Sequence, residues 1–205
     1  MQYNEIIKNT SAVILAGGRG SRLDGRDKGL ISIAGQPMIE HLLKQLHEQI
    51  PRIIISANRN IERYQAYNLP VIMDEERDYA GPLAGISAAM QAVSSEYLLT
   101  LPCDAPVIAH DYLKRMATAL CQKPADIAIA TDGNSLQYIH TLIPVRLHQH
   151  LQKHLQAGHH RVGEWLRQNS FTEVDFSDQA EAFHNMNTEA DRLKLVEQSA
   201  PDCHL

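Results

Sequence analysis

The sequence is short of cysteine and of long apolar runs. Its three cysteines, Cys103, Cys121 and Cys203, are far apart and form no C-x-x-C pair. We therefore expect neither a disulfide framework nor a structural zinc site. We expect a reducing, cytoplasmic compartment. No apolar run approaches the roughly 18 residues of a membrane-spanning helix, and the N-terminal residues lack the apolar core of a secretory signal. We expect a cytoplasmic protein that does not associate with membranes.

Positive charge is not in excess either. The 19 Lys and Arg residues stand against 24 Asp and Glu residues, a formal net charge of −5. Broad binding to nucleic acid needs a basic face, so no nucleic-acid partner is expected, although a local cationic pocket is compatible with this balance. The 205 residues are enough for one domain that buries about 70% of its unfolded surface.

Several well-known catalytic motifs are also missing. The P-loop pattern G-x-x-x-x-G-K-[ST] is absent because Gly29 follows Lys28, and G-x-G-x-x-G fails because Leu23 stands at its last position. There is no H-E-x-x-H and no G-x-S-x-G. Cys103 has no evident catalytic partner and is expected in the core. The clustered histidines lack a carboxylate at ligand spacing and are expected to be solvated; they are His148, His150, His154, His159 and His160.

The most informative segment present runs from Ala12 to Lys28. An apolar run, Val13–Leu15, indicates a buried strand and leads into a loop rich in glycine and cations, among them Gly17, Gly18, Gly20, Arg19, Arg22 and Lys28. Glycine lets the backbone approach a ligand, successive N–H groups bind anions, and lysine adds a point charge. The loop predicts nucleotide binding; the alternative is a surface loop with solvated charges.

Short apolar strands alternate with helical patterns along the first two thirds of the chain. Strands are expected at 13–15, 52–57, 71–73, 97–101 and 126–130, and helices at about 37–49, 61–67, 82–93 and 110–121. This alternation is typical of an α/β fold: a single three-layer α/β/α domain (1–205, core about 11–198, termini frayed) with a mostly parallel, Rossmann-like sheet. The C-terminal third is less regular, with an extended stretch at 136–145, a strand at 171–176 and helices at about 146–156, 161–168 and 188–197.

Polar residues follow the predicted strands. In parallel sheets ligands bind at the carboxyl ends of strands, so the glycine loop, Ser56, Asn58, Asp74 and Asp104 should converge on one rim. Asp104 follows a buried strand and suits Mg²⁺, which takes one or two carboxylates plus phosphate oxygens; its alternative is a helix cap.

The other candidates each have a structural alternative. Lys28 and Arg22 would neutralise a triphosphate, or be solvated surface charges. Asp74 and Asn58 would recognise the ribose or the base of a nucleotide. The alternative for Asp74 is an exposed position in an acidic loop, and the alternative for Asn58 is a turn. Asn185 and Asn187 would project to one face of an extended segment and bind the second substrate, or precede a helix capped by Thr188.

An ordered set of motifs resembles the molybdenum cofactor guanylyltransferases. The segments are LAGGRGSRLDGRDKGL, IAGQPM, SANRN, VIMDE, GPLAGI, LPCDAP and NMNT, and the similarity covers about residues 11–195. The resemblance implies Mg²⁺-dependent transfer of GMP from GTP to the terminal phosphate of Mo-molybdopterin, with release of pyrophosphate. Molybdoenzyme apoproteins or their maturation factors would be partners.

The resemblance also implies roles for individual residues. Asp104 would bind GTP and Mg²⁺, and with Lys28 and Arg22 would be catalytic. By this resemblance the GTP side comprises Leu15, Ala16, Gly17, Lys28, Asp74 and Asp104, and the molybdopterin side Arg161, Asn185 and Asn187. Gly18, Ser56 and Asn58 are expected on the GTP side from their places in the glycine loop and at a strand end. Two positions depart from the family: Ser56, where asparagine is frequent, and Ile139-His140-Thr141, where His-Pro-Thr is common.

Three other functions are compatible with the same residues. A cytidylyltransferase for the same pterin and a sugar-phosphate nucleotidylyltransferase would share the fold. A non-catalytic GTP-binding maturation factor would bind nucleotide without releasing pyrophosphate.

Overall fold

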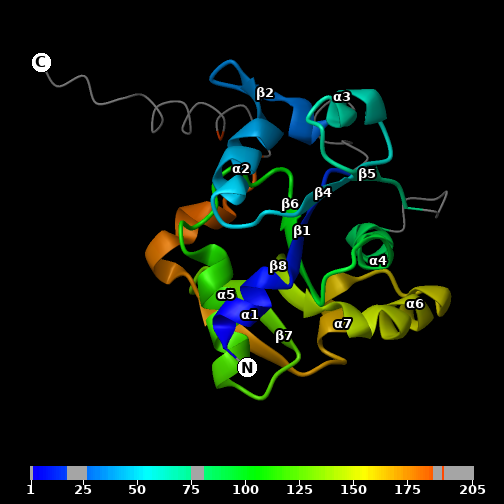
Figure 1. Ribbon diagram of the computed structural model, residues 1–205, viewed down its shortest axis with the longest axis vertical. Helices are drawn as coiled ribbons and strands as arrows, with labels where there is room; N and C mark the ends of the chain where they lie inside the picture. Colours follow the sequence, from blue (N-terminus) through cyan, green and yellow to red (C-terminus); the bar gives the residue numbers. More distant parts are fainter. Residues whose placement is uncertain (1, 18–26, 75–80, 187–190, 192–205) are drawn as a thin grey trace, which may run out of the picture.

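A seven-stranded sheet forms the centre of the protein (Figure 1). The computed structural model describes residues 2–17, 27–74, 81–186 and 191. The strands lie in the order β5-β4-β1-β6-β8-β7-β9. Their bounds are β1 Thr10–Leu15, β4 Ile53–Ser56, β5 Val71–Ile72, β6 Tyr97–Pro102, β7 Ile127–Thr131, β8 Leu136–Pro144 and β9 Phe171–Asp175.

The predicted parallel character of the sheet is confirmed, with β8 as the exception. The pairs β1–β4, β1–β6, β4–β5 and β7–β9 are parallel, whereas β8 runs antiparallel to both of its neighbours, β6 and β7. The residue pattern of a strand does not encode the direction in which it pairs, so the reversal of β8 could not be read from the sequence.

Helices cover both faces, as the three-layer prediction requires (Figure 1). The core cluster on one face involves α1, α2, α3, α5 and η3, and the cluster on the other face involves α4, α6 and α7. Their bounds are α1 Tyr3–Lys8, α2 Met38–His47, α3 Ile61–Gln65, α4 Pro82–Ala92, α5 Tyr112–Gln122, α6 His148–Gln156, α7 Val162–Leu166 and η3 Ser177–Phe183. The short elements are η1 Lys28–Leu30, β2 Ser32–Ile33, β3 Gln36–Pro37 and η2 Val145–Leu147.

The side-chain alternation of β1 explains why both faces must be covered. Ala12 and Ile14 belong to one core cluster, and Val13 belongs to the other. Because successive residues of a strand point to opposite faces, an all-apolar strand is stable only between two layers of helices.

Two predictions needed correction, and one lies outside the described residues. His154 is not solvated as predicted, because it lies on the buried side of α6. The packed part of the chain begins before residue 11, because α1 buries Ile6 against the core. The helix expected at 188–197 lies outside the residues that the structure describes.

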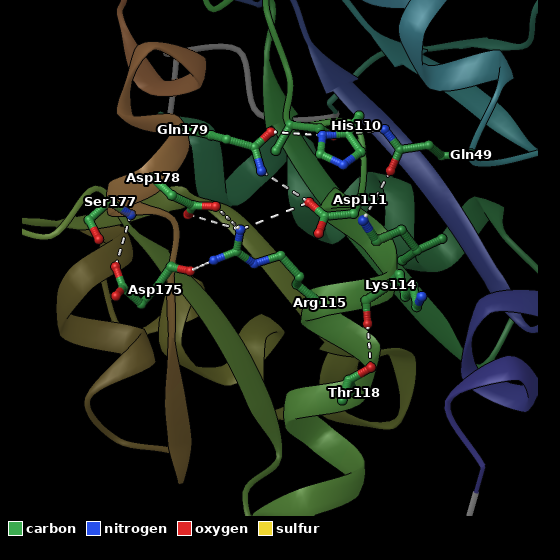
Figure 2. A network of polar contacts seen from close by, with 12 residues as sticks. Gln49, His110, Asp111, Lys114, Arg115, Thr118, Asp175, Ser177, Asp178 and Gln179 are labelled. Atoms are coloured by element: carbon green, nitrogen blue, oxygen red, sulfur yellow. Dashed lines mark hydrogen bonds and ion pairs between the residues drawn. The ribbon is translucent and has the colours of Figure 1, made fainter.

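A polar network fastens the segment after β9 to α5 (Figure 2). Arg115 donates to both carboxylate oxygens of Asp178, at 3.0 Å each, and to the carbonyl of Asp175. Gln179 contacts His110 and Asp111 at 3.1 and 3.2 Å. These contacts hold η3 in place, and the chain that follows it reaches the end of β6.

Candidate functional site

The register of the sheet aligns four strand ends at one edge. Leu15 of β1 pairs with Ser56 of β4 and with Pro102 of β6, and Ser56 pairs with Ile72 of β5. The residues that follow these strands therefore emerge side by side. Because β8 is antiparallel, its first half, Leu136–His140, lies at the same edge.

A cavity of about 450 Å³ opens at this edge, within the usual range for small-molecule sites. Polar, charged and glycine residues form part of its wall, and apolar or aromatic residues form the rest. The first group is Gly17, Lys28, Arg59, Asp104, Gln137, His140 and Asn185; the second is Leu15, Ala16, Pro82, Pro102, Cys103, Leu136, Tyr138 and Ile139. We call this space the main cavity.

Lys28 and Asp104 form an ion pair in the wall of the main cavity. The Lys28 ammonium lies 2.7 Å from Oδ2 of Asp104, and both side chains are partly exposed, at 26% and 17%. The predicted proximity of the loop lysine to the carboxylate after β6 is confirmed. The helix-cap alternative for Asp104 is not realised, since the residue before α5 is Asp111.

The C-terminal segment completes this side of the cavity. The backbone N–H of Met186 donates to the carbonyl of Asp104 at 2.7 Å. Its neighbour Asn185 lines the main cavity and is exposed. Asn187, Gly18 and Arg22 lie outside the residues that the structure describes.

Asn58 and Asp74 join the ends of β4 and β5 through two hydrogen bonds. The Asn58 amide donates to Oδ2 of Asp74 at 2.7 Å and accepts from the Asp74 backbone N–H at 3.1 Å. Asn58 flanks the main cavity, because a Cβ added to Gly17 would lie 3.6 Å from its Nδ2. Asp74 lines a smaller space of about 200 Å³ between α4 and α6.

Ser56 and Arg161 are placed away from the main cavity wall. Ser56 is buried, and a Cβ added to Gly85 of α4 would lie 2.7 Å from its Oγ. Arg161, just before α7, pairs with Glu164 at 3.2 Å, and its side chain is 85% exposed. In this arrangement neither side chain contributes to the group around Lys28 and Asp104.

Sequence reasoning missed Arg59 and Tyr138. Arg59 follows the strand-end residue Asn58, so its position after β4 could have marked it as a cavity residue. Tyr138 lines the main cavity because β8 runs antiparallel to its neighbours, and the sequence does not reveal that direction. Its ring packs on Gly163, where a Cβ would lie 3.3 Å from Cζ, and its hydroxyl accepts from Arg167 at 2.6 Å.

His140 and Cys103 are buried at the base of the main cavity. Burial lowers the pKa of His140 to about 3, so the imidazole is neutral, and its ring makes edge contacts with Tyr112 and Phe183. Burial raises the pKa of the Cys103 thiol. The expected core position of Cys103 is confirmed, and a buried thiol that keeps its proton is a poor nucleophile.

The donor groups of the main cavity fit Mg²⁺ bound in part by a substrate. Among the described residues no group of three or more His, Cys, Asp or Glu side chains could hold a metal ion by itself. Asp104 is the carboxylate among the lining residues, and Mg²⁺ commonly takes one or two carboxylates, phosphate oxygens and water. This donor set requires phosphate oxygens to complete it.

Comparison with known proteins identifies the family. Residues 12–174 match the model of the MobA-like NTP transferase domain. The molybdenum cofactor guanylyltransferase of Shewanella halifaxensis is 39% identical over 189 residues, 92% of this chain and 94% of that protein. The chain belongs to the molybdenum cofactor guanylyltransferase family. The enzyme of the same name from Shewanella putrefaciens is 41% identical over 86% of this chain and 91% of its own length.

Membership of this family makes the protein a nucleotidyltransferase. Solved structures share the fold at low identity. Molybdopterin-guanine dinucleotide biosynthesis protein A from Archaeoglobus fulgidus has a TM-score of 0.76 at 19% identity, covering 92% of this chain and 97% of its own. CMP:2-keto-3-deoxy-manno-octonic acid synthetase has a TM-score of 0.67 at 17% identity, covering 92% and 97%. None of the described helices is long and apolar enough to cross a bilayer.

Proposed function

We propose that this enzyme transfers GMP from GTP to the terminal phosphate of Mo-molybdopterin, in a Mg²⁺-dependent reaction that forms Mo-molybdopterin guanine dinucleotide and pyrophosphate. The observation that carries the proposal is the contact of Lys28 with Asp104 in a cavity that begins at the end of β1. The names of relatives about 40% identical to this chain support GTP and the molybdenum cofactor as substrates.

The reaction needs no catalytic base. A phosphate monoester has a second pKa of about 6, so the attacking phosphate is already a dianion at neutral pH. One of its oxygens bonds to the α-phosphorus of GTP, the α–β anhydride bond breaks, and pyrophosphate leaves with the electron pair. The difficulty is to bring two polyanions together. Phosphoryl-transfer enzymes overcome it by positioning the two substrates and by neutralising the charge of their phosphates.

The residues divide this work between them. Gly17 lets the backbone approach the phosphates, and Lys28 neutralises the triphosphate and the leaving pyrophosphate, together with the predicted Arg22. Asp104 would hold Mg²⁺, which when bound supplies further neutralisation of phosphate oxygens. Leu15, Ala16, Asn58 and Asp74 are proposed for the GTP side, with Gly18 and Ser56.

The molybdopterin side is proposed around Asn185 of the C-terminal segment. Asn185 lines the main cavity, and the backbone N–H of the next residue, Met186, donates to the carbonyl of Asp104. Asn187 and Arg161 are proposed with it on the grounds of the family resemblance. Molybdoenzyme apoproteins or their maturation factors would receive the product, and the reaction would take place in the cytoplasm.

Pyrophosphate release from each of the four nucleoside triphosphates, with and without Mo-molybdopterin, tests the proposal. We expect release with GTP only, and only when Mo-molybdopterin and Mg²⁺ are present. Release with CTP would instead indicate a cytidylyltransferase, and release with a sugar phosphate as acceptor a sugar-phosphate nucleotidylyltransferase. GTP binding without release under any condition would indicate a non-catalytic maturation factor.

A further inference from the structure

A buried carboxylate lies directly before the proposed phosphate-binding lysine. Asp27 is 8% exposed although it is charged, and burial of an unpaired carboxylate is costly. Its partners all come from the segment at and just before α3. Tyr64 donates to Oδ1 at 2.6 Å, Asn60 donates to Oδ2 at 2.9 Å, and Arg59 lies 3.6 Å from Oδ2. We call Asp27, Asn60 and Tyr64 the Asp27 anchor.

The local backbone is built for this contact. Asn60 has a left-handed conformation (φ 50°, ψ 33°) that directs the start of α3, and asparagine tolerates this region better than most residues. Tyr64 is fully buried, and burial raises the pKa of its hydroxyl, which therefore keeps its proton and remains a donor. A Cβ on Gly29 would lie 2.7 Å from that hydroxyl, so glycine is what allows Tyr64 to approach.

The anchor determines where Lys28 points. Asp27 has an extended backbone (φ −77°, ψ 113°), and Lys28 follows it as the first residue of η1. With the Asp27 side chain held by Tyr64 and Asn60, the backbone from which the Lys28 side chain departs is fixed, and the Lys28 ammonium contacts Asp104. The backbone turn is also closed, because the N–H of Leu30 donates to the carbonyl of Asp27 at 3.1 Å.

We propose that the Asp27 anchor is a positioning device, in which Tyr64 and Asn60 act through Asp27 to hold Lys28 ready for the phosphates of a nucleoside triphosphate. This inference rests on the proposed function, since it assumes that Lys28 binds the triphosphate. Neither Tyr64 nor Asn60 is required to touch the substrate. Their contribution is to reduce the number of orientations that Lys28 must give up when the nucleotide binds.

A double-mutant cycle tests the proposal. Pyrophosphate release and GTP affinity by calorimetry would be measured for the wild type, Tyr64→Phe, Lys28→Ala and the double variant. We expect Tyr64→Phe alone to lower kcat/KM for GTP roughly ten-fold, the scale of one hydrogen bond to a charged group. In the Lys28→Ala background the same change should have less than about a two-fold effect, because coupled residues are not additive. An equal loss in both backgrounds would mean that Tyr64 acts only on general stability and would overturn the proposal.

A second pair of variants guards against misfolding of Tyr64→Phe. Asn60→Gly keeps the left-handed backbone and removes the amide that contacts Asp27, so it should repeat the loss of GTP affinity. Asn68→Gly is its matched control: Asn68 is exposed, lies just after α3 and has the same left-handed backbone (φ 56°). Unchanged GTP affinity in Asn60→Gly, or an equal loss in Asn68→Gly, would contradict the anchor.

The two proposals fail separately. A wild-type protein that binds GTP but releases no pyrophosphate overturns the proposed function, while the binding cycle still decides the anchor. A wild-type protein that releases pyrophosphate but shows additive variants overturns the anchor alone. If no nucleoside triphosphate binds, both are wrong.

Discussion

The ammonium of Lys28 lies 2.7 Å from Oδ2 of Asp104, although 76 residues separate them in the chain. The pair joins the segment after β1 to the end of β6, the two strands that are neighbours at the centre of the sheet. As an ion pair, Lys28 and Asp104 largely neutralise each other's charge. In the proposed complex they have separate roles: Lys28 would bind the triphosphate and Asp104 would hold the metal ion. Each residue can therefore be tested by itself.

Asp104→Ala should slow turnover by roughly 100-fold or more, the scale of removing one preorganised electrostatic group from an active site. The loss should appear in kcat and should not be restored by excess GTP, since the proposed role is in the reacting complex. Steady-state pyrophosphate release checks this. Turnover near that of the wild type would remove Asp104 from the catalytic machinery.

Lys28→Ala should raise KM for GTP about ten-fold or more and also lower kcat, because the cation is lost from both the bound and the reacting triphosphate. Lys44→Ala is the matched control, since Lys44 is exposed on α2. Calorimetric titration with GTP measures the affinity. Equal affinities for the two variants would show that Lys28 does not bind the nucleotide.

Gly29→Ala should destabilise the fold by about 1–3 kcal/mol, because the added Cβ would lie 2.7 Å from the Tyr64 hydroxyl and 3.4 Å from Cβ of Cys103. Adding Tyr64→Phe removes the atom in closest contact and should restore part of this stability. GTP affinity should stay low in the double variant, since the bond to Asp27 is still missing. Urea unfolding and GTP titration separate the two effects, and no stability regained would argue against the clash.

His140→Phe should flatten the loss of stability in acid. Because the pKa of buried His140 is lowered to about 3, the unfolded chain binds a proton between about pH 6.5 and pH 3 that the folded chain does not. Stability attributable to this residue is complete above about pH 6.5 and falls as the pH is lowered. From pH 6.5 to pH 5 this loss should amount to about 1.5 kcal/mol. Chemical denaturation at several pH values measures it, and parallel curves for both proteins would contradict it.

The order of strands and helices, and the cationic glycine loop that ends at Lys28, could be predicted from local sequence patterns. Val13–Leu15 is apolar at every position, and α2 carries Ile39, Leu42, Leu43 and Leu46 on one face, so hydrophobic period alone specifies the strand and the helix. The rule that ligands bind at the carboxyl ends of parallel strands then predicts Lys28 and Asp104 at the same edge of the sheet.

The reversal of β8, the Asp27 anchor and the burial of His154 depended on contacts between distant segments. The residue pattern of Leu136–Pro144 indicates an extended segment but not its direction, and its antiparallel pairing with β6 and β7 brings Tyr138 to the main cavity. The residues that hold Asp27 come from α3 and the residue before it, more than 30 residues away, and no pattern within the loop identifies them.

The amino-acid sequence by itself determined the layered α/β architecture, because period and burial are properties of neighbouring residues along the chain. It also carried the motif order that is characteristic of the family. Tertiary structure alone decided which of the many polar residues share a wall, since hydrogen bonds and ion pairs depend on distances across the fold. For that reason Ser56, predicted on the GTP side, and Arg161, predicted on the molybdopterin side, are not among the residues that line the main cavity, whereas Arg59 and Tyr138 are.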